Sequence, residues 1–218
     1  MDRIWPTRPP AQSVAAYHTW LDLTFLHWRV PIEQIRPLIP PELTLDTWDG
    51  DAMIGLVPFQ LRDVRPRRLP VLPGISHFLE TNLRTYVPYY WARMTLKSDV
   101  DRRPYHSHRL RSRTSVTTDV RVELGDWFAE EGAASGSLEH FLVERYPLYA
   151  QARDGRILQG QVYHRPYPLR AVTQVQCQES LSTAAGITLA SPPCHAIFSP
   201  GVRVQVLGLQ EILPVYQS

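Results

Sequence analysis

The chain has 218 residues, of which 44% are hydrophobic and 20% are charged, and its formal net charge is +2. This composition is globular and excludes a disordered chain, and the length suits a single domain, expected to span residues 1–218. The two cysteines, Cys177 and Cys194, have no metal-type spacing. No apolar run approaches the roughly 18 residues of a membrane span, so we expect a cytoplasmic protein without a membrane partner.

The N-terminal third reads as an arm, a strand, a short helix and a hairpin. Residues 1–16 are expected to form an N-terminal arm. The alternating segment 21–30 predicts a strand that stops at Pro31, and residues 31–43 predict a short helix between prolines. The Asp-Gly pair at positions 49–50 separates two apolar-rich runs and predicts a tight hairpin.

Further along the chain, strand patterns dominate. Residues 88–124 predict an antiparallel pair that turns near 99–103, and residues 136–146 predict a helix with Ser137 as its N-cap. A second Asp-Gly hairpin is expected at 154–155, and residues 202–209 are strand-like. Short strands with a few short helices, in a chain with twenty prolines, indicate an α+β protein that is mostly antiparallel β, either a double sheet or a cone-shaped barrel.

The segment SHFLETNLRTYV, residues 76–87, separates into a polar row and an apolar row. One face carries Phe78, Glu80, Asn82, Arg84 and Tyr86, and the other carries Leu79, Thr81, Leu83, Thr85 and Val87. The polar row is either solvated or networked with a neighbouring strand, because a stranded buried charge costs several kcal/mol. The segment with Tyr105, Ser107 and Arg109 offers a polar face of matching period. From the residues alone, the apolar row is the more natural inner face.

The usual catalytic signatures are absent from the sequence, and no cofactor is expected. His106 and His108 supply only half of a metal site, so a solvated strand face is favoured over metal binding. Cys194 and His195 are a weak nucleophile pair, since adjacent strand residues point to opposite faces.

Arginine-rich segments at 62–68 and 102–113 raise the possibility of nucleic-acid binding. The acidic residues nearly balance this charge, and the aromatic and glycine pattern of an RNA-binding sheet is missing. Surface charge on an arginine-rich protein is the favoured explanation, and no nucleic-acid partner is expected. Self-association into a homo-oligomer is left open.

Several motifs in order resemble the YqjF-like family, a bacterial domain of unknown function related to acetoacetate decarboxylase. They are FLHWRVP, GLVPF, ExNxRTYV, YxSxR, GSLEHFLVERYPLY and HRPYPL, from about Leu21 to the C-terminus. The resemblance implies an acetoacetate-decarboxylase-like fold around a central cavity. The resemblance also implies that the polar row of residues 78–86 faces this cavity.

The chain departs from these relatives in two ways. The Schiff-base lysine that follows a proline in acetoacetate decarboxylase has its counterpart here at Pro88-Tyr89-Tyr90, and Lys97, the single lysine, lies elsewhere, so imine chemistry is not carried over. Relatives also have a strand and a helix where this chain joins Val87 to Pro88, which indicates an internal deletion beside the expected cavity.

The expected function is the binding or turnover of a small carboxylate-bearing molecule, with Arg84 or Arg109 holding the carboxylate and Glu80 as general acid or base. The other ligand-binding candidates, some of them implied by the resemblance, are Asn82, Tyr86, Ser107, Arg145, Tyr146, His164 and His27. A non-catalytic ligand-sensing or interaction module is the alternative, and nucleic-acid binding through surface arginines is the third choice.

Overall fold

The computed structural model describes residues 12–85, 94–96, 105–108, 116–152, 154, 156–190 and 192–212. The strands are β1 (Val14–Val30), β2 (Thr47–Trp48), β3 (Asp51–Pro66), β4 (Phe78–Thr85), β5 (Met94–Leu96), β6 (Tyr105–His108), β7 (Thr117–Ala129), β8 (Pro147–Gln151), β9 (Ile157–Tyr163), β10 (Leu169–Glu179), β11 (His195–Leu207) and β12 (Gln210–Ile212). The helices are α1 (Ile32–Ile35), the 3-10 turn η2 (Arg36–Leu38), α2 (Leu138–Val143) and α3 (Leu181–Ala184). None of these described helices is long and apolar enough to cross a membrane.

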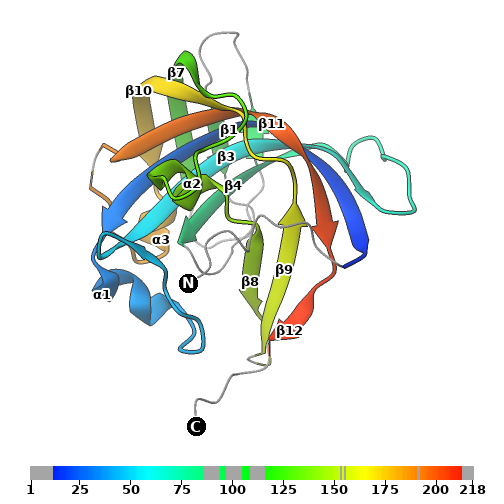
Figure 1. Ribbon diagram of the computed structural model, residues 1–218, viewed down its shortest axis with the longest axis horizontal. Helices are drawn as coiled ribbons and strands as arrows, with labels where there is room; N and C mark the ends of the chain where they lie inside the picture. The colour runs from blue at the N-terminus through cyan, green and yellow to red at the C-terminus, as the bar shows by residue number, and fades with distance from the viewer. Residues whose placement is uncertain are drawn as a thin grey trace.

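The strands form one antiparallel sheet with the order β1-β3-β4-β5-β6-β7-β10-β11-β9-β12, and β11 also pairs with β1. Long, curved β1, β3 and β11 lie side by side, and α2 lies in front of them (Figure 1). A mostly antiparallel sheet with a few short helices is the class that the sequence predicted.

Most of the predicted local elements are confirmed. Asp49 and Gly50 form the turn between β2 and β3, both with positive φ, as a type I′ hairpin turn requires. Strands β8 and β9 form the second hairpin, and β5 pairs with β6. Ser137 caps α2 by accepting a hydrogen bond from the backbone N–H of His140 at 3.1 Å.

Two boundaries differ from the predictions. The expected arm is shorter, because β1 begins at Val14, which pairs with Leu207. The helix expected to reach Tyr146 ends at Val143. The reason is Pro147, which disfavours helical geometry at the preceding residue, and the carbonyl of Tyr146 instead accepts a hydrogen bond from the N–H of Val162.

Strands β1, β3 and β4 carry a hydrophobic core on each face. On one face Phe25, Val57 and Phe59 pack against Phe141 and other residues around α2, β9 and β11, which we call the α2-side core. The other face packs against β7 and β10 through a cluster of Leu26, Trp28, Leu56, Leu79, Val120 and Val122.

This arrangement resolves the question of where the polar row of β4 points. Glu80 is 3% exposed and is paired in register with Phe59, so it faces the α2-side core, and Asn82, two residues on, is 7% exposed. Leu79 on the opposite face is also only 7% exposed. The described residues of both rows are buried or half-buried, because a layer covers each face of the strand.

Candidate functional site

A row of paired residues across four strands brings two histidines and an arginine to one face. His195 of β11 is paired with His27 of β1, His27 with Gly55 of β3, and Gly55 with Arg84 of β4. Directly paired residues of neighbouring strands point to the same face of a sheet. The register therefore directs His195, His27 and Arg84 toward the α2-side core.

Gly55 allows the two side chains beside it to approach each other. A Cβ atom at this position would lie 3.2 Å from Cδ2 of His27 and 3.4 Å from Nε of Arg84. Both distances are shorter than most contacts that Cβ atoms make in proteins. A larger residue at this position would therefore push the imidazole and the guanidinium aside.

Arg84 is held in place through one hydrogen bond and one ring contact. Its Nη2 donates to the carbonyl of Leu142 at 2.9 Å, and its guanidinium carbon lies 5.4 Å from the centre of the Phe25 ring. Its Nε is buried and has no acceptor among the described residues. Within the described part of the chain, no carboxylate lies within ion-pair distance of Arg84.

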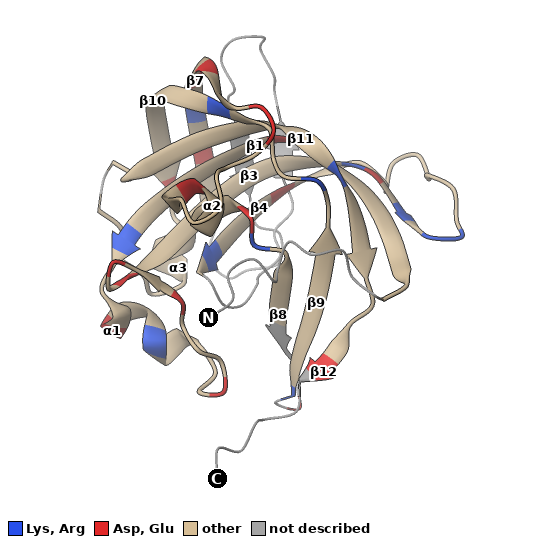
Figure 2. Cartoon of the chain, viewed as in Figure 1, with Lys and Arg blue, Asp and Glu red and all other residues tan. Residues whose placement is uncertain are grey.

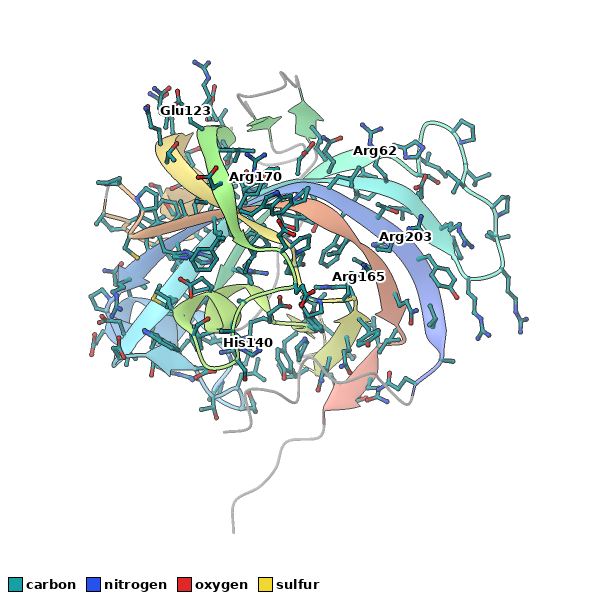
Figure 3. All side chains as sticks on the ribbon, turned by 45° about the horizontal axis from the view of Figure 1, so that its top comes forward. Arg62, Glu123, His140, Arg165, Arg170 and Arg203 are labelled. Atoms are coloured by element: carbon teal, nitrogen blue, oxygen red, sulfur yellow. The ribbon has the colours of Figure 1, made fainter. Side chains whose placement is uncertain are left out.

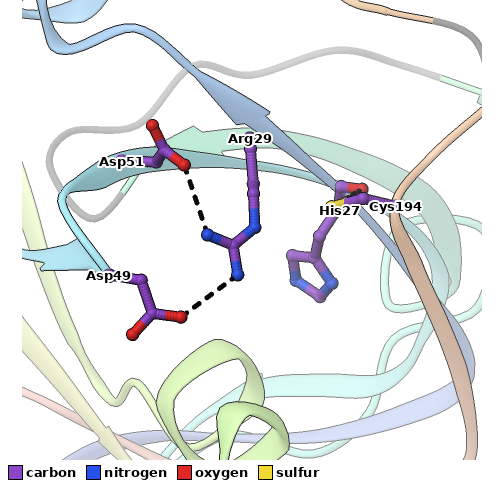
Figure 4. A network of polar contacts seen from close by, with 5 residues as sticks. All are labelled: His27, Arg29, Asp49, Asp51 and Cys194. Atoms are coloured by element: carbon purple, nitrogen blue, oxygen red, sulfur yellow. Dashed lines mark hydrogen bonds and ion pairs between the residues drawn. The ribbon is translucent and has the colours of Figure 1, made fainter.

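Arg29 shows the contrast between a neutralised arginine and Arg84. It lies two residues after His27 on β1 and donates to Asp51 at 3.2 Å and to Asp49 at 3.3 Å (Figure 4). The thiol of Cys194 is also engaged, since it donates to the backbone carbonyl of His27 at 3.3 Å. Neither Arg29 nor Cys194 thus adds an unused group to the site.

His27 and His195 form a hydrogen-bonded imidazole pair. Their Nδ1 atoms lie 3.1 Å apart, so one carries a proton and the other accepts it. Nε2 of His195 lies 3.8 Å from the Glu139 carboxylate, which favours a proton on that nitrogen and leaves Nδ1 of His195 as the acceptor. His27 then donates through Nδ1 and presents an unprotonated Nε2, which is buried and has no partner among the described residues. Burial is the main cause that lowers the pKa of His27 well below its usual value, and repulsion from a protonated His195 and from Arg84 acts in the same direction.

Glu144 is a buried carboxylate whose pKa is influenced by the charge of Arg84. Its Oε2 accepts a hydrogen bond of 2.6 Å from the Tyr146 hydroxyl, and its Oε1 accepts one of 3.0 Å from the Tyr167 N–H. Burial raises the pKa of Glu144, while these two bonds and the charge of Arg84 oppose the rise.

His164 closes the group on the side of Tyr146 and Tyr167. Its Nδ1 donates to the carbonyl of Arg165 at 2.7 Å, and its ring centre lies 4.1 Å from that of Tyr146 and 4.4 Å from that of Tyr167. Burial, and to a smaller extent the charge of Arg84, lower the pKa of His164 to about 4, although its hydrogen bond to the carbonyl of Arg165 opposes the shift. Its Nε2 is buried without a partner in the described part of the chain. We call the set His27, Arg84, Glu144, Tyr146, His164 and Tyr167 the Arg84 cluster.

Four of the residues selected from the sequence meet in the Arg84 cluster: His27, Arg84, Tyr146 and His164. Glu80 and Asn82 lie on the same face of β4 as Arg84, and Oδ1 of Asn82 is buried with no donor among the described residues. Arg145 is directed elsewhere, since it forms an ion pair of 2.8 Å with Asp46.

The remaining selected residues are not all described. Tyr86 and Arg109 lie outside the described residues, as do Lys97 and the segment 86–93. Ser107 belongs to β6, but the side chains of that strand are not described. The segment that offered a polar face of matching period is not the direct neighbour of β4, because the short β5 pairs with both β4 and β6 and stands between them. Shared hydrogen bonds between the two polar rows stay a prediction.

The sequence reasoning missed two residues of the Arg84 cluster, Tyr167 and Glu144. Glu144 lies inside the segment expected to be helical through Tyr146, where a charged residue is expected to be solvated. The signal was Pro147, which ends the helix early and lets the carboxylate turn inward.

Comparisons with known proteins place the chain in a family. The DUF2071 family, described as an uncharacterized conserved protein, matches residues 17–88 and 87–203. The two matched segments meet at the junction of Val87 and Pro88, although the deletion there stays a prediction. The protein named "Uncharacterized protein YqjF" of Bacillus subtilis (strain 168) is 31% identical over 201 residues, which cover 78% of this chain and 81% of that protein.

Two solved enzymes are similar in structure. The enduracididine biosynthesis enzyme MppR, complexed with the condensation product of pyruvate and imidazole 4-carboxaldehyde, has a TM-score of 0.51 and 11% identity, with 91% of this chain and 90% of that chain covered. This likeness shows the fold alone and, with the strand topology, confirms the predicted fold class. An acetoacetate decarboxylase-like enzyme from Sphingomonas wittichii RW1 has a TM-score of 0.41 and 11% identity, with 93% and 95% covered. The resemblance predicted from the motifs is confirmed at the level of sequence, and the chain belongs to the DUF2071 family, with YqjF as a relative.

Proposed function

We propose that the chain binds a small carboxylate-bearing molecule at Arg84, in a polar cavity of which the Arg84 cluster is one wall. The observation that carries the proposal is the state of Arg84. Its guanidinium lies over the Phe25 ring of the α2-side core, uses one nitrogen for a protein hydrogen bond, and meets no carboxylate within 4.0 Å among the described residues.

A carboxylate is the ligand that suits such a group. The guanidinium fork makes two parallel hydrogen bonds to carboxylate oxygens and stays charged at every relevant pH. A cation that is partly removed from water also gains more from an anionic partner than a solvated one does. In this respect Arg84 differs from Arg29, Arg145 and Arg156, which are paired with carboxylates of the protein itself.

The residues around Arg84 could also transfer protons, which would make the chain an enzyme rather than a binding module. His27 has a buried Nε2 without a partner among the described residues, and Glu144 has a raised pKa. Glu80, buried on the same face, remains a candidate acid or base. None of these roles needs an imine. MppR, the fold neighbour, is complexed with the condensation product of pyruvate and imidazole 4-carboxaldehyde. Pyruvate is a carboxylate, which agrees with the proposed ligand class.

We expect small carboxylates such as pyruvate and acetoacetate to raise the melting temperature of the protein with the logarithm of their concentration above the dissociation constant. The Arg84→Lys variant should lose most of this shift and bind about tenfold more weakly or worse, because a charged hydrogen bond contributes roughly 1.5–3 kcal/mol. Differential scanning fluorimetry against a panel of carboxylates measures both effects.

Arg170→Lys is the matched control. Arg170 also donates to one backbone carbonyl, that of Gly125, and also lies over an aromatic ring, that of Trp127 at 5.8 Å. The Arg170→Lys variant should show the same rise in melting temperature with carboxylates as the wild type. If Arg84→Lys keeps it as well, Arg84 is structural and the proposed function is wrong. Binding without any turnover of the bound carboxylates would favour the sensing module over an enzyme.

A further inference from the structure

A second cationic site lies at the other end of the long strands. A cleft of about 560 Å³ opens there, and its lining includes Tyr17 and Thr19 of β1, Asp63 and Arg65 of β3, Arg165 after β9 and Arg203 of β11. This volume is within the range of small-molecule pockets, roughly 300–1,000 Å³. The cleft is therefore large enough for a metabolite.

The register of three strands explains why arginines from separate segments gather there. Tyr17 is paired with Arg65 on one side of β1, and Thr19 is paired with Arg203 on the other. Arg165 follows the end of β9, whose Tyr163 is paired with Gln205 of β11. Figure 3 shows Arg165 and Arg203 on the same side of the molecule.

These guanidinium groups are unlike most others in the described part of the chain. Among its described residues, the arginines whose guanidinium groups make no hydrogen bond or ion pair are Arg65, Arg67, Arg68, Arg165 and Arg203. Three of these line the cleft, and Arg67 and Arg68 lie on the loop from β3 to β4, whose blue tip is at the right of Figure 2. The unpaired positive charge is thus concentrated around one concave surface.

The lining supplies little negative charge of its own. Asp63 is the acidic residue among the lining residues, and its carboxylate accepts a hydrogen bond from the Thr19 hydroxyl at 3.4 Å. The guanidinium of Arg65 lies 4.7 Å from the centre of the Tyr17 ring, which limits the orientations it can take. Three arginines and one aspartate leave the lining with a surplus of two positive charges, which matches a dianion.

We propose that this cleft binds a small molecule that carries a phosphate group. A phosphate dianion matches the charge surplus, and arginine forks bind its oxygens in the same bidentate way as they bind carboxylates. The cleft shares one lining residue, His164, with the Arg84 cluster, but its three arginines come from the opposite end of the long strands, so this proposal does not depend on the proposed function. Its size favours a small phosphorylated molecule over a nucleic acid, whose recognition uses an extended basic surface.

Isothermal titration of the full chain with pyrophosphate, at constant ionic strength set with sodium chloride, tests the proposal. We expect saturable binding that weakens by about tenfold or more in Arg203→Gln and in Arg165→Gln. Arg121→Gln, on β7 and paired with Asp119, should bind pyrophosphate as the wild type does. Arg84→Lys should also bind it normally, even though it loses the carboxylate response, and this separates the two proposals.

Two outcomes would overturn the cleft as a phosphate site. One is the absence of saturable pyrophosphate binding, or binding that neither Arg203→Gln nor Arg165→Gln weakens. The other is tight, strongly salt-dependent binding of a single-stranded oligonucleotide without binding of pyrophosphate, which would make the cleft part of a nucleic-acid surface.

Discussion

Replacing Glu144 with alanine is expected to lower the free energy of unfolding by about 3 kcal/mol, since each buried polar group left unsatisfied costs roughly 1–3 kcal/mol. The change removes the acceptor of two buried donors, the Tyr146 hydroxyl and the Tyr167 N–H. It also removes the carboxylate whose pKa responds to Arg84. Urea denaturation followed by tryptophan fluorescence measures the loss.

Glu144→Gln separates the hydrogen bonds from the charge. Glutamine keeps an acceptor for the Tyr167 N–H and carries no charge to desolvate, so the variant should stay within about 1 kcal/mol of the wild type. Glu123→Ala, at a half-buried position of β7, is a control for removing a glutamate and should cost less than about 0.5 kcal/mol. A Glu144→Ala variant no less stable than Glu123→Ala would mean that the Glu144 contacts contribute nothing to the fold.

The protein should also lose stability in mild acid, because it buries neutral histidines. The pKa of His164 is about 4 in the folded protein, against a usual value of 6.5. Between pH 6.5 and pH 4, His164 therefore binds a proton in the unfolded chain but stays neutral in the folded chain. The free energy of unfolding is unaffected by this proton above pH 6.5. As the pH falls from 6.5 toward 4, the free energy of unfolding decreases by about 3 kcal/mol, at 1.36 kcal/mol for each pH unit. Burial lowers the pKa of His18 to about 4 and that of His27 in the same direction.

The variant His164→Phe isolates this contribution. Phenylalanine fits among the rings of Trp20, Tyr146 and Tyr167 but cannot take up a proton. Free energies of unfolding between pH 7 and pH 4.5 should fall less steeply in this variant than in the wild type. Equal slopes for wild type and His164→Phe would show that folding does not lower the pKa of His164.

The local elements were predictable because their signals are local. An Asp-Gly pair between apolar runs encodes a hairpin, and Ser137 before an apolar helix encodes a cap. The orientation of the polar row on β4 was not predictable from its own residues. Alternation separates Glu80 from Leu79, but only the tertiary structure covers both faces of the strand.

The candidate site depends on strand register, which the sequence does not reveal. His27, Gly55 and Arg84 are far apart in the chain and become neighbours only through the pairing of β1 with β3 and of β3 with β4. The bulge in β1 between Leu21 and Leu26 shifts that pairing by one residue, and a shift of one residue reverses which side chains face the core. Glu144 escaped prediction for a different reason, because an early helix end outweighed the helical propensity of the segment.

The central claim, that a carboxylate binds at Arg84, is tested most directly by the imidazole NMR signals of His27 and His164 during a titration with pyruvate. Arg84 lowers the pKa of both rings, in addition to burial, so a carboxylate that offsets its charge must change both environments. We predict that both signals shift and saturate together with the rise in melting temperature, while the signal of His77 does not move. Saturable binding of pyruvate that leaves the His27 and His164 signals unchanged, or no saturable binding of any small carboxylate, would contradict the claim.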